Sequence, residues 1–177
     1  TAPADGTVFN DGEAIAFAGT ATDEETSDWL LGVVWTSDRD GVLNTESPDP
    51  LSDVSFTSSD LSVGDHTITL SATDGDGQTS TTSIVLTVNG LPTAPTVTIA
   101  PADPATTDDL VATATGSTDE DGDAITYTYA WTVGGVATEY EEDTVPASAT
   151  TSGDVWAVTV TASDEYGTGG SSSASVT

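Results

Sequence analysis

Short runs rich in valine, threonine and aromatic residues alternate with turns rich in glycine, aspartate, serine and proline along the whole chain. This alternation is typical of an all-β protein built from many short strands. The long apolar faces of a helical protein are absent. The predicted strands lie near residues 7–9, 13–20, 29–36, 51–57, 65–73 and 80–88, and then near 96–100, 109–115, 124–133, 144–149, 154–162 and 170–177.

The third strand of each half has an apolar residue at every second position. A strand with one buried and one solvated face has this period of two. We therefore predict that Trp35 and Trp131 are central core residues, since a large aromatic side chain in such a strand usually packs inside. The alternating positions are Trp29, Leu31, Val33 and Trp35 in the first half, and Ile125, Tyr127, Tyr129 and Trp131 in the second.

The pattern occurs twice. An acidic segment, Thr22–Glu25, precedes the strand that ends at Trp35, and a similar segment, Thr118–Asp121, precedes the strand that ends at Trp131. A duplicated pattern predicts two structurally similar units. Because the chain begins and ends within this pattern, we expect it to be a piece of a longer protein.

The boundary between the repeats falls in a short segment with two prolines, Pro92 and Pro95. Such a segment predicts a stiff, extended connection. We therefore assign residues 1–90 to the first β-sandwich and residues 94–177 to the second.

The charge is extreme. The chain carries 30 Asp and Glu residues against one Arg and no Lys, for a formal net charge of −29 at pH 7. Nucleic-acid binding requires Lys and Arg, so it is excluded as a function, and anionic membrane surfaces are disfavoured. No stretch approaches the roughly 18 apolar residues of a membrane span, so we expect no membrane insertion. Self-repulsion at this charge calls for screening by salt or divalent cations.

Catalytic groups are scarce. Cysteine is absent, and His66 is the single histidine. Nothing in the sequence places a serine beside His66, so we expect an ordinary residue at a strand end and no catalytic triad. Paired carboxylates could serve a glycosidase, but such an enzyme needs a cleft that two small sandwiches rarely supply. The sequence predicts that the protein is not an enzyme.

Several segments resemble the PKD-type and related immunoglobulin-like domains of bacterial surface proteins, with a cadherin-like relative as the alternative. The resemblance covers nearly the whole chain, twice, and implies two tandem immunoglobulin-like Greek-key β-sandwiches of an extracellular or cell-surface protein. The segments that carry it are Asp119–Asp123, Tyr129–Trp131 and Ala157–Gly167 in the second repeat, and Trp35 with Thr67–Gly77 in the first.

The carboxylates concentrate in two loops of each repeat. In this type of sandwich, the loop between the second and third strands and the loop between the last two strands lie at the same end. We therefore expect each repeat to gather about six carboxylates at one tip. These residues are Asp119, Glu120, Asp121, Asp123, Asp164 and Glu165 in the second repeat, and Asp23, Glu24, Glu25, Asp28, Asp74 and Asp76 in the first.

Calcium suits such loops, because it accepts six to eight oxygen ligands in flexible geometry. Magnesium demands a stricter octahedron, and zinc prefers the His and Cys ligands that are nearly absent here. The segment Asp119–Asp123 is too short for an EF-hand and lacks its flanking helices. We predict sandwich-loop Ca²⁺ sites, with solvated turns of a halophilic or marine protein as the alternative. All the acidic residues above except Glu25 and Glu165 are assigned as metal ligands, and Asp164 and Asp74 lead them, because each follows a well-defined strand.

Two functions remain open. The first is a calcium-binding structural or adhesive module of an extracellular stalk, adhesin or filament, with neighbouring repeats or identical subunits as partners. Strand pairing through the last segment, residues 169–177, could build a fibre. The second is a carbohydrate- or protein-binding accessory module of a secreted protein, which would recognise a glycan or surface receptor. Its candidate aromatic platform is Tyr140, Tyr166 and Trp156.

Overall fold

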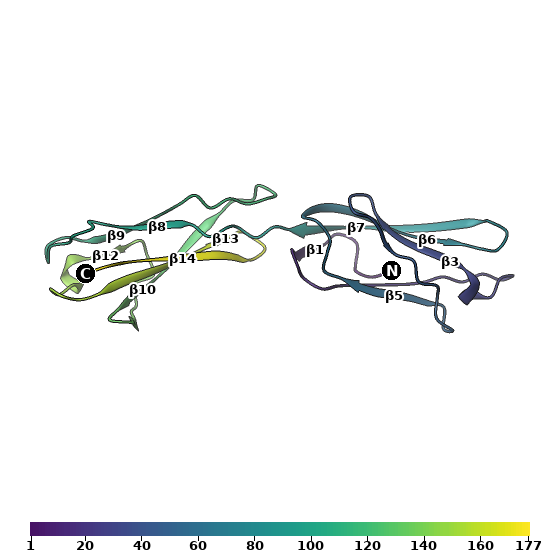
Figure 1. Ribbon diagram of the computed structural model, residues 1–177, viewed down its shortest axis with the longest axis horizontal. Coiled ribbons are helices and arrows are strands. Elements are labelled where there is room, and N and C mark those ends of the chain that lie inside the picture. The colour runs from purple at the N-terminus through teal and green to yellow at the C-terminus, as the bar shows by residue number, and fades with distance from the viewer. The chain divides into compact units, whose positions relative to one another are not determined.

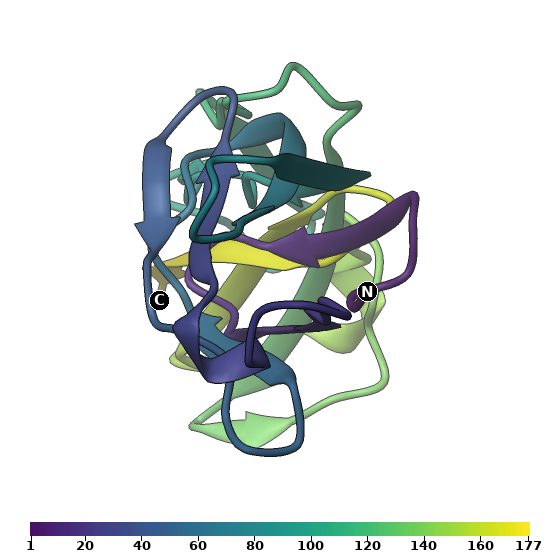
Figure 2. The ribbon, with the colours of Figure 1, turned by 90° about the vertical axis from the view of Figure 1, so that its right-hand side faces the viewer.

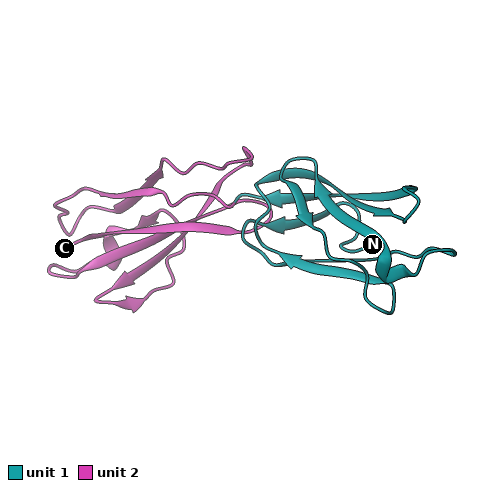
Figure 3. Cartoon of the chain, turned by 45° about the vertical axis from the view of Figure 1, so that its right-hand side comes forward, with its two compact units in different colours: residues 1–90 teal, residues 91–177 magenta.

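The computed structural model describes residues 1–177, and the chain divides into two compact units, Thr1–Gly90 and Leu91–Thr177 (Figure 3). We call them unit 1 and unit 2. Each consists of two β-sheets, which Figures 1 and 2 show from two directions. The helices are two single 3₁₀ turns, η1 (Asp28–Leu30) and η2 (Ala147–Ala149). No helix has the length and apolar character that crossing a membrane would require.

Unit 1 pairs a five-stranded sheet with a two-stranded sheet. All neighbouring strands are antiparallel except β1, which pairs with β7 in parallel. The large sheet has the order β1 (Thr7–Asn10), β7 (Thr79–Asn89), β6 (Gly64–Thr73), β3 (Gly32–Ser37) and β4 (Gly41–Asn44), and the small sheet consists of β2 (Ile15–Thr20) and β5 (Asp53–Ser58).

Unit 2 pairs a four-stranded sheet with a three-stranded one, and all its strand pairs are antiparallel. The first sheet has the order β11 (Val136–Ala137), β10 (Thr126–Val133), β13 (Trp156–Ser163) and β14 (Thr168–Val176), and the second has the order β12 (Thr144–Val145), β9 (Leu110–Thr115) and β8 (Thr96–Ala100).

The two units share one strand plan. In unit 1, β2 and β5 form one sheet while β3, β6 and β7 lie in the other, so the chain crosses repeatedly between the layers. In unit 2, β9 and β12 take the place of β2 and β5, and β10, β13 and β14 take that of β3, β6 and β7. This is the Greek-key arrangement of an immunoglobulin-like β-sandwich. The predicted all-β fold class is confirmed.

A tryptophan stands at the centre of each core, as predicted. Trp35 and Trp131 are each only 1% exposed. Trp35 packs against Phe17 and Phe56, with ring centroids 5.9 and 5.7 Å away. Trp131 packs edge-on against Trp156, with centroids 6.3 Å apart. Aromatic pairs at such separations contribute beyond the area they bury. The rings of unit 1 join its two sheets, whereas Trp131 and Trp156 both belong to the four-stranded sheet of unit 2.

The strand predictions fail where a short turn of helix replaces an extended segment. The strand predicted at 29–36 begins only at Gly32, because residues Asp28–Leu30 form η1, and Trp29 of this turn is 58% exposed. The strand predicted at 144–149 ends at Val145, since Pro146 is followed by η2. The short strands β4 and β11 were not predicted, because two to four residues are too few to display an alternation.

Candidate metal centre

Three aspartates converge in the loop between β9 and β10. Asp119, Asp121 and Asp123 each offer a carboxylate oxygen, and these oxygens all lie within 4.8 Å of one another. Oxygens that bind one calcium ion at about 2.3–2.6 Å can stand up to about 5 Å apart, whereas magnesium at about 2.0–2.1 Å limits the span to about 4 Å. Oxygens within this limit are compatible with a single calcium ion.

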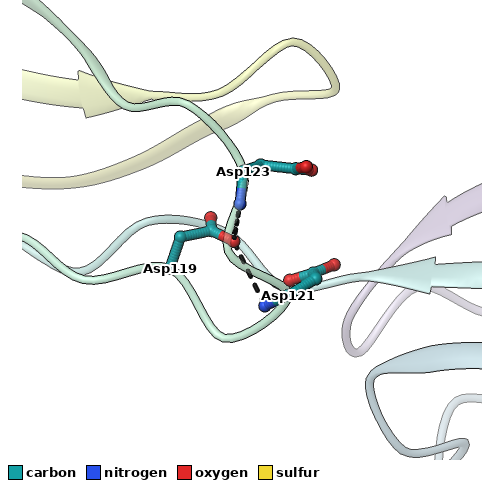
Figure 4. A group of neighbouring side chains, drawn as sticks. All are labelled: Asp119, Asp121 and Asp123. Atoms are coloured by element: carbon teal, nitrogen blue, oxygen red, sulfur yellow. Dashed lines mark hydrogen bonds between the residues drawn. The ribbon is translucent and has the colours of Figure 1, made fainter.

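Asp119 organises this loop. Its Oδ1 atom accepts hydrogen bonds from the backbone N–H groups of Asp121 at 3.2 Å, Gly122 at 3.0 Å and Asp123 at 3.0 Å. Figure 4 shows the bonds to Asp121 and Asp123. Aspartate commonly folds the following residues back in this way, and Gly122, with φ of +84°, adopts the left-handed turn that glycine favours. The turn brings the other two carboxylates toward Asp119.

The second oxygen of Asp119 is unusual. Oδ2 is shielded from solvent and has no hydrogen-bond partner within the protein. A buried carboxylate oxygen without a partner is unfavourable, and such an atom calls for a cation, a water molecule or a donor. The hydroxyl of Ser117, two residues earlier, is also buried without a partner. Ser117 could not be selected from the sequence, because an isolated serine in a loop carries no signal.

Asp123 is the carboxylate on which the negative charges of its neighbours act most clearly. Burial raises the pKa of the Asp123 carboxyl, and the negative charges of Asp119, Asp121, Glu165 and Asp164 raise it further. Glu165 and Asp164 belong to the loop between β13 and β14. The structure therefore brings both acidic loops of unit 2 within electrostatic reach at one end of the sandwich. A divalent cation is the simplest way to relieve this repulsion.

Asp164 resembles Asp119 in its local role. Its Oδ1 atom accepts hydrogen bonds from the backbone N–H groups of Tyr166 at 2.7 Å and Gly167 at 2.6 Å. It thus closes the turn that connects β13 to β14. Glu120 is exposed and lies between two members of the aspartate group without belonging to it.

In unit 1 the acidic loop before β3 is arranged differently. Asp23 Oδ1 accepts hydrogen bonds from the backbone N–H groups of Glu25 at 3.0 Å and Thr26 at 2.5 Å. Asp28 accepts one from the Asp23 N–H at 3.0 Å and one from the Ser52 hydroxyl at 2.5 Å. The backbone bond from Thr26 lowers the pKa of Asp23, and the bond from Ser52 lowers that of Asp28. These carboxylates are stabilised as anions by the protein's own donors.

In the second acidic loop of unit 1, an aspartate again accepts hydrogen bonds from residues of its own loop. Asp74 accepts hydrogen bonds from the backbone N–H groups of Asp76 and Gln78 at 2.9 and 2.8 Å, and from the Gln78 side chain at 3.2 Å. Asp23 and Asp74 line a shared cavity of about 260 Å³, so the two loops do meet at one end. Glu24 and Asp76 are exposed. Unit 1 places its predicted ligands near one another but holds Asp23, Asp28 and Asp74 by internal hydrogen bonds.

His66 lies near the start of β6, as predicted for a residue at a strand end, but the structure places a serine beside it. The residue is 1% exposed, and its Nδ1 atom lies 2.8 Å from the Ser37 hydroxyl. Its Nε2 atom lies 2.6 Å from the Ser62 carbonyl oxygen. Ser37 is itself buried and accepts hydrogen bonds from the backbone N–H groups of Arg39 and Asp40. Both ring nitrogens and the hydroxyl are engaged, so the cluster fixes the turn after β3.

The predicted aromatic platform is not assembled. Trp156 is 4% exposed and packs in the core of unit 2, where its ring centroid lies 6.0 Å from that of Tyr140. Tyr140 is half-buried, and only Tyr166 is well exposed, at 46%. A flat carbohydrate platform needs several exposed rings, so these three residues do not form one.

Comparison with known proteins assigns the chain to no family. No family model matches the chain, and no curated protein does either. Among solved structures, the fibronectin(III)-like modules of Clostridium thermocellum CbhA share 17% identity at a TM-score of 0.43, over 98% of this chain and 90% of that one. The three N-terminal domains of the bacteriophage RB49 outer capsid protein Hoc share 20% identity at a TM-score of 0.37, over 96% and 55%. The assignment to PKD-type or cadherin-like domains stays a prediction.

Proposed function

We propose that the chain is a non-enzymatic, calcium-binding structural module of an extracellular stalk, adhesin or filament. The observation that carries this proposal is the group formed by Asp119, Asp121 and Asp123, whose oxygens lie within 4.8 Å of one another. The unpartnered Oδ2 atom of Asp119 supports it independently, because a cation would satisfy that buried oxygen.

In this proposal Ca²⁺ is held by Asp119, Asp121 and Asp123, and the loop of Asp164 and Glu165 supplies further negative charge nearby. The ion neutralises the repelling carboxylates of the loop between β9 and β10 and offsets their repulsion with the acidic loop between β13 and β14. Both effects favour the folded state, since the unfolded chain has no preformed site. Calcium therefore stiffens one end of unit 2.

Two further features support a structural role. The chain repeats one sandwich plan in tandem, which suits a module of an elongated surface protein. Its net charge of −29 disfavours association with like-charged molecules and membranes until cations screen it. The pair nearest to a catalytic constellation, Ser37 and His66, is buried and out of reach of a substrate, which supports a non-enzymatic role.

Calcium titration calorimetry on chelator-treated protein tests the proposal. We expect saturable binding by the intact chain and strong weakening in an Asp123→Asn variant. Asp103→Asn is the matched control, because Asp103 is an exposed aspartate of unit 2 outside the group and its substitution removes the same charge. Equal weakening by both variants would mean that calcium only screens the overall charge, and the proposed site would be rejected.

A further inference from the structure

The strand β10 has an edge that its neighbour covers only in part. On one side, β13 pairs with β10 along its whole length, from Thr126 to Val133. On the other side, β11 pairs only with Thr132 and Val133. The turn at Gly134–Gly135 is tight, with φ of +56° and +80°, and the returning strand is only two residues long. The stretch 126–130 is therefore an open sheet edge.

The backbone groups on this edge can be assigned from Trp131. Its N–H donates to the Tyr140 carbonyl at 3.3 Å, and its carbonyl accepts from the Thr138 N–H at 3.0 Å. Both bonds leave β10 on the side away from β13. Hydrogen-bonding direction alternates along an antiparallel strand, so the N–H and C=O groups of Tyr127 and Tyr129 point to this same side. There they can pair with an added strand.

A groove accompanies the open edge. It has a volume of about 390 Å³, and its walls include Tyr129 of β10 and Tyr140 of the segment after β11. Trp131 contributes to its lining as well. Cavities of about 300–1,000 Å³ with mainly apolar and aromatic walls are the usual size and character of ligand sites. A side chain of a bound segment would fit between the two tyrosines.

The groove is bordered by negative charge. The four acidic residues of the segment that follows β11 are all exposed: Glu139, Glu141, Glu142 and Asp143. Glu141 and Glu142 line the groove directly. Burial raises the pKa of Tyr129, and the charge of Asp143 raises it further, which places this carboxylate within electrostatic reach of the groove. The border therefore favours a cationic ligand.

We propose that this groove binds an extended, positively charged peptide segment of another protein, which adds a strand to the open edge of β10. The backbone of Tyr127 and Tyr129 would form the ladder, and lysine or arginine side chains would pair with Glu141 and Glu142. These 177 residues include one arginine and no lysine, so none of their segments has this character. A second copy is also repelled by its own charge of −29. The proposal does not depend on calcium.

The test uses a capped hexapeptide of alternating lysine and valine as the probe. Its control is the same peptide N-methylated at alternate residues, which keeps the charge but cannot form a ladder. We expect the first peptide to shift the Tyr127 and Tyr129 amide resonances and to protect these amides from hydrogen exchange. N-methylation is expected to weaken binding by at least about tenfold, because it removes the backbone hydrogen bonds.

Variants of the chain complete the test. The double variant Glu141→Lys/Glu142→Lys should lose most of the binding, while Asp103→Lys, a charge reversal elsewhere in unit 2, should retain most of it. Equal binding of both peptides, or equal loss in both variants, would show nonspecific charge attraction and overturn the proposal. Binding of neutral cellohexaose at Tyr129 without binding of the peptide would overturn it as well.

Discussion

Asp119 accepts a hydrogen bond from the backbone N–H of Asp123 at 3.0 Å, while its negative charge raises the pKa of the Asp123 carboxyl. The same turn thus holds the two residues together and makes them repel. A bound cation therefore stabilises this loop more than it would stabilise a loop whose carboxylates lie far apart.

Asp123→Asn should have opposite effects with and without calcium. In chelator, the variant removes a repelled charge, so we expect a small rise in the unfolding midpoint of unit 2, on the order of 1–2 °C. In calcium, it should lose most of the calcium-induced rise, since it removes a ligand. Differential scanning calorimetry under both conditions measures this. A variant less stable than the parent in chelator would contradict the assigned repulsion.

The pH dependence of Asp123 is expected to oppose that of Asp28. The pKa of Asp123 is raised above its ordinary value of 3.8, mainly by burial. Between 3.8 and the raised pKa the folded protein binds more protons than the unfolded chain, so this residue's contribution to the free energy of unfolding falls as pH rises.

Asp28 behaves in the reverse sense, because the Ser52 hydroxyl lowers its pKa. Its contribution is complete above 3.8 and is lost as pH falls through its lowered folded pKa. Carbon-detected NMR titration of the aspartate carboxyls should give the higher midpoint for Asp123. Adding calcium should lower that midpoint and leave the one for Asp28 unchanged if unit 1 binds no ion. A fall at Asp28 as well would instead support the site predicted for unit 1.

Two substitutions at Asp119 should separate its structural role from its charge. Asp119→Asn keeps an oxygen acceptor, so we expect the loop to fold but to bind calcium weakly. Asp119→Ala also removes three backbone hydrogen bonds to a charged group, and we expect it to lower the free energy of unfolding by about 2 kcal/mol more than the asparagine. Denaturant unfolding in chelator gives the difference. Equal stability of the two variants would argue against Asp119 as the organiser of the turn.

Gly169 should tolerate no side chain. A Cβ atom at this position would lie 2.1 Å from the Pro92 carbonyl oxygen, whereas one at Gly75 would meet nothing within 4 Å. We expect Gly169→Ala to displace the segment around Pro92 from β14 and to destabilise unit 2 by at least about 2 kcal/mol. Gly75→Ala is the control and should be nearly neutral. Hydrogen exchange at the Gly170 amide, which donates to Pro92 at 2.8 Å, reports the displacement directly.

The features that occur in both repeats could be predicted from the sequence. Alternation around Trp35 and Trp131 located the third strands and both cores, because period-two patterning reflects burial directly. The alternation could not show that Trp29 lies in a 3₁₀ turn, since three residues are too few to distinguish a helical turn from the start of a strand. The sequence also could not predict β11 or the open edge of β10, because a strand of two residues is too short to show an alternation.

For the candidate site, the sequence predicted which loops carry the acidic residues but not the contacts of each carboxylate. Loop composition identified Asp119, Asp121 and Asp123, and sandwich topology brought Asp164 toward them. The sequence could not distinguish Asp123, which is repelled, from Asp28, which is satisfied by Ser52, because that difference depends on a contact between residues far apart in the chain. The Ser37–His66 bond was missed for the same reason.

Thermal unfolding in calcium and in chelator, at constant ionic strength and with magnesium as the control, tests the central claim most directly. We predict a calcium-specific rise in the midpoint of unit 2. At a calcium concentration one hundred times the dissociation constant, the stabilisation should approach about 2.7 kcal/mol. An unchanged midpoint, or an equal rise with magnesium, would show that the acidic loops are solvated surface and would contradict the calcium site.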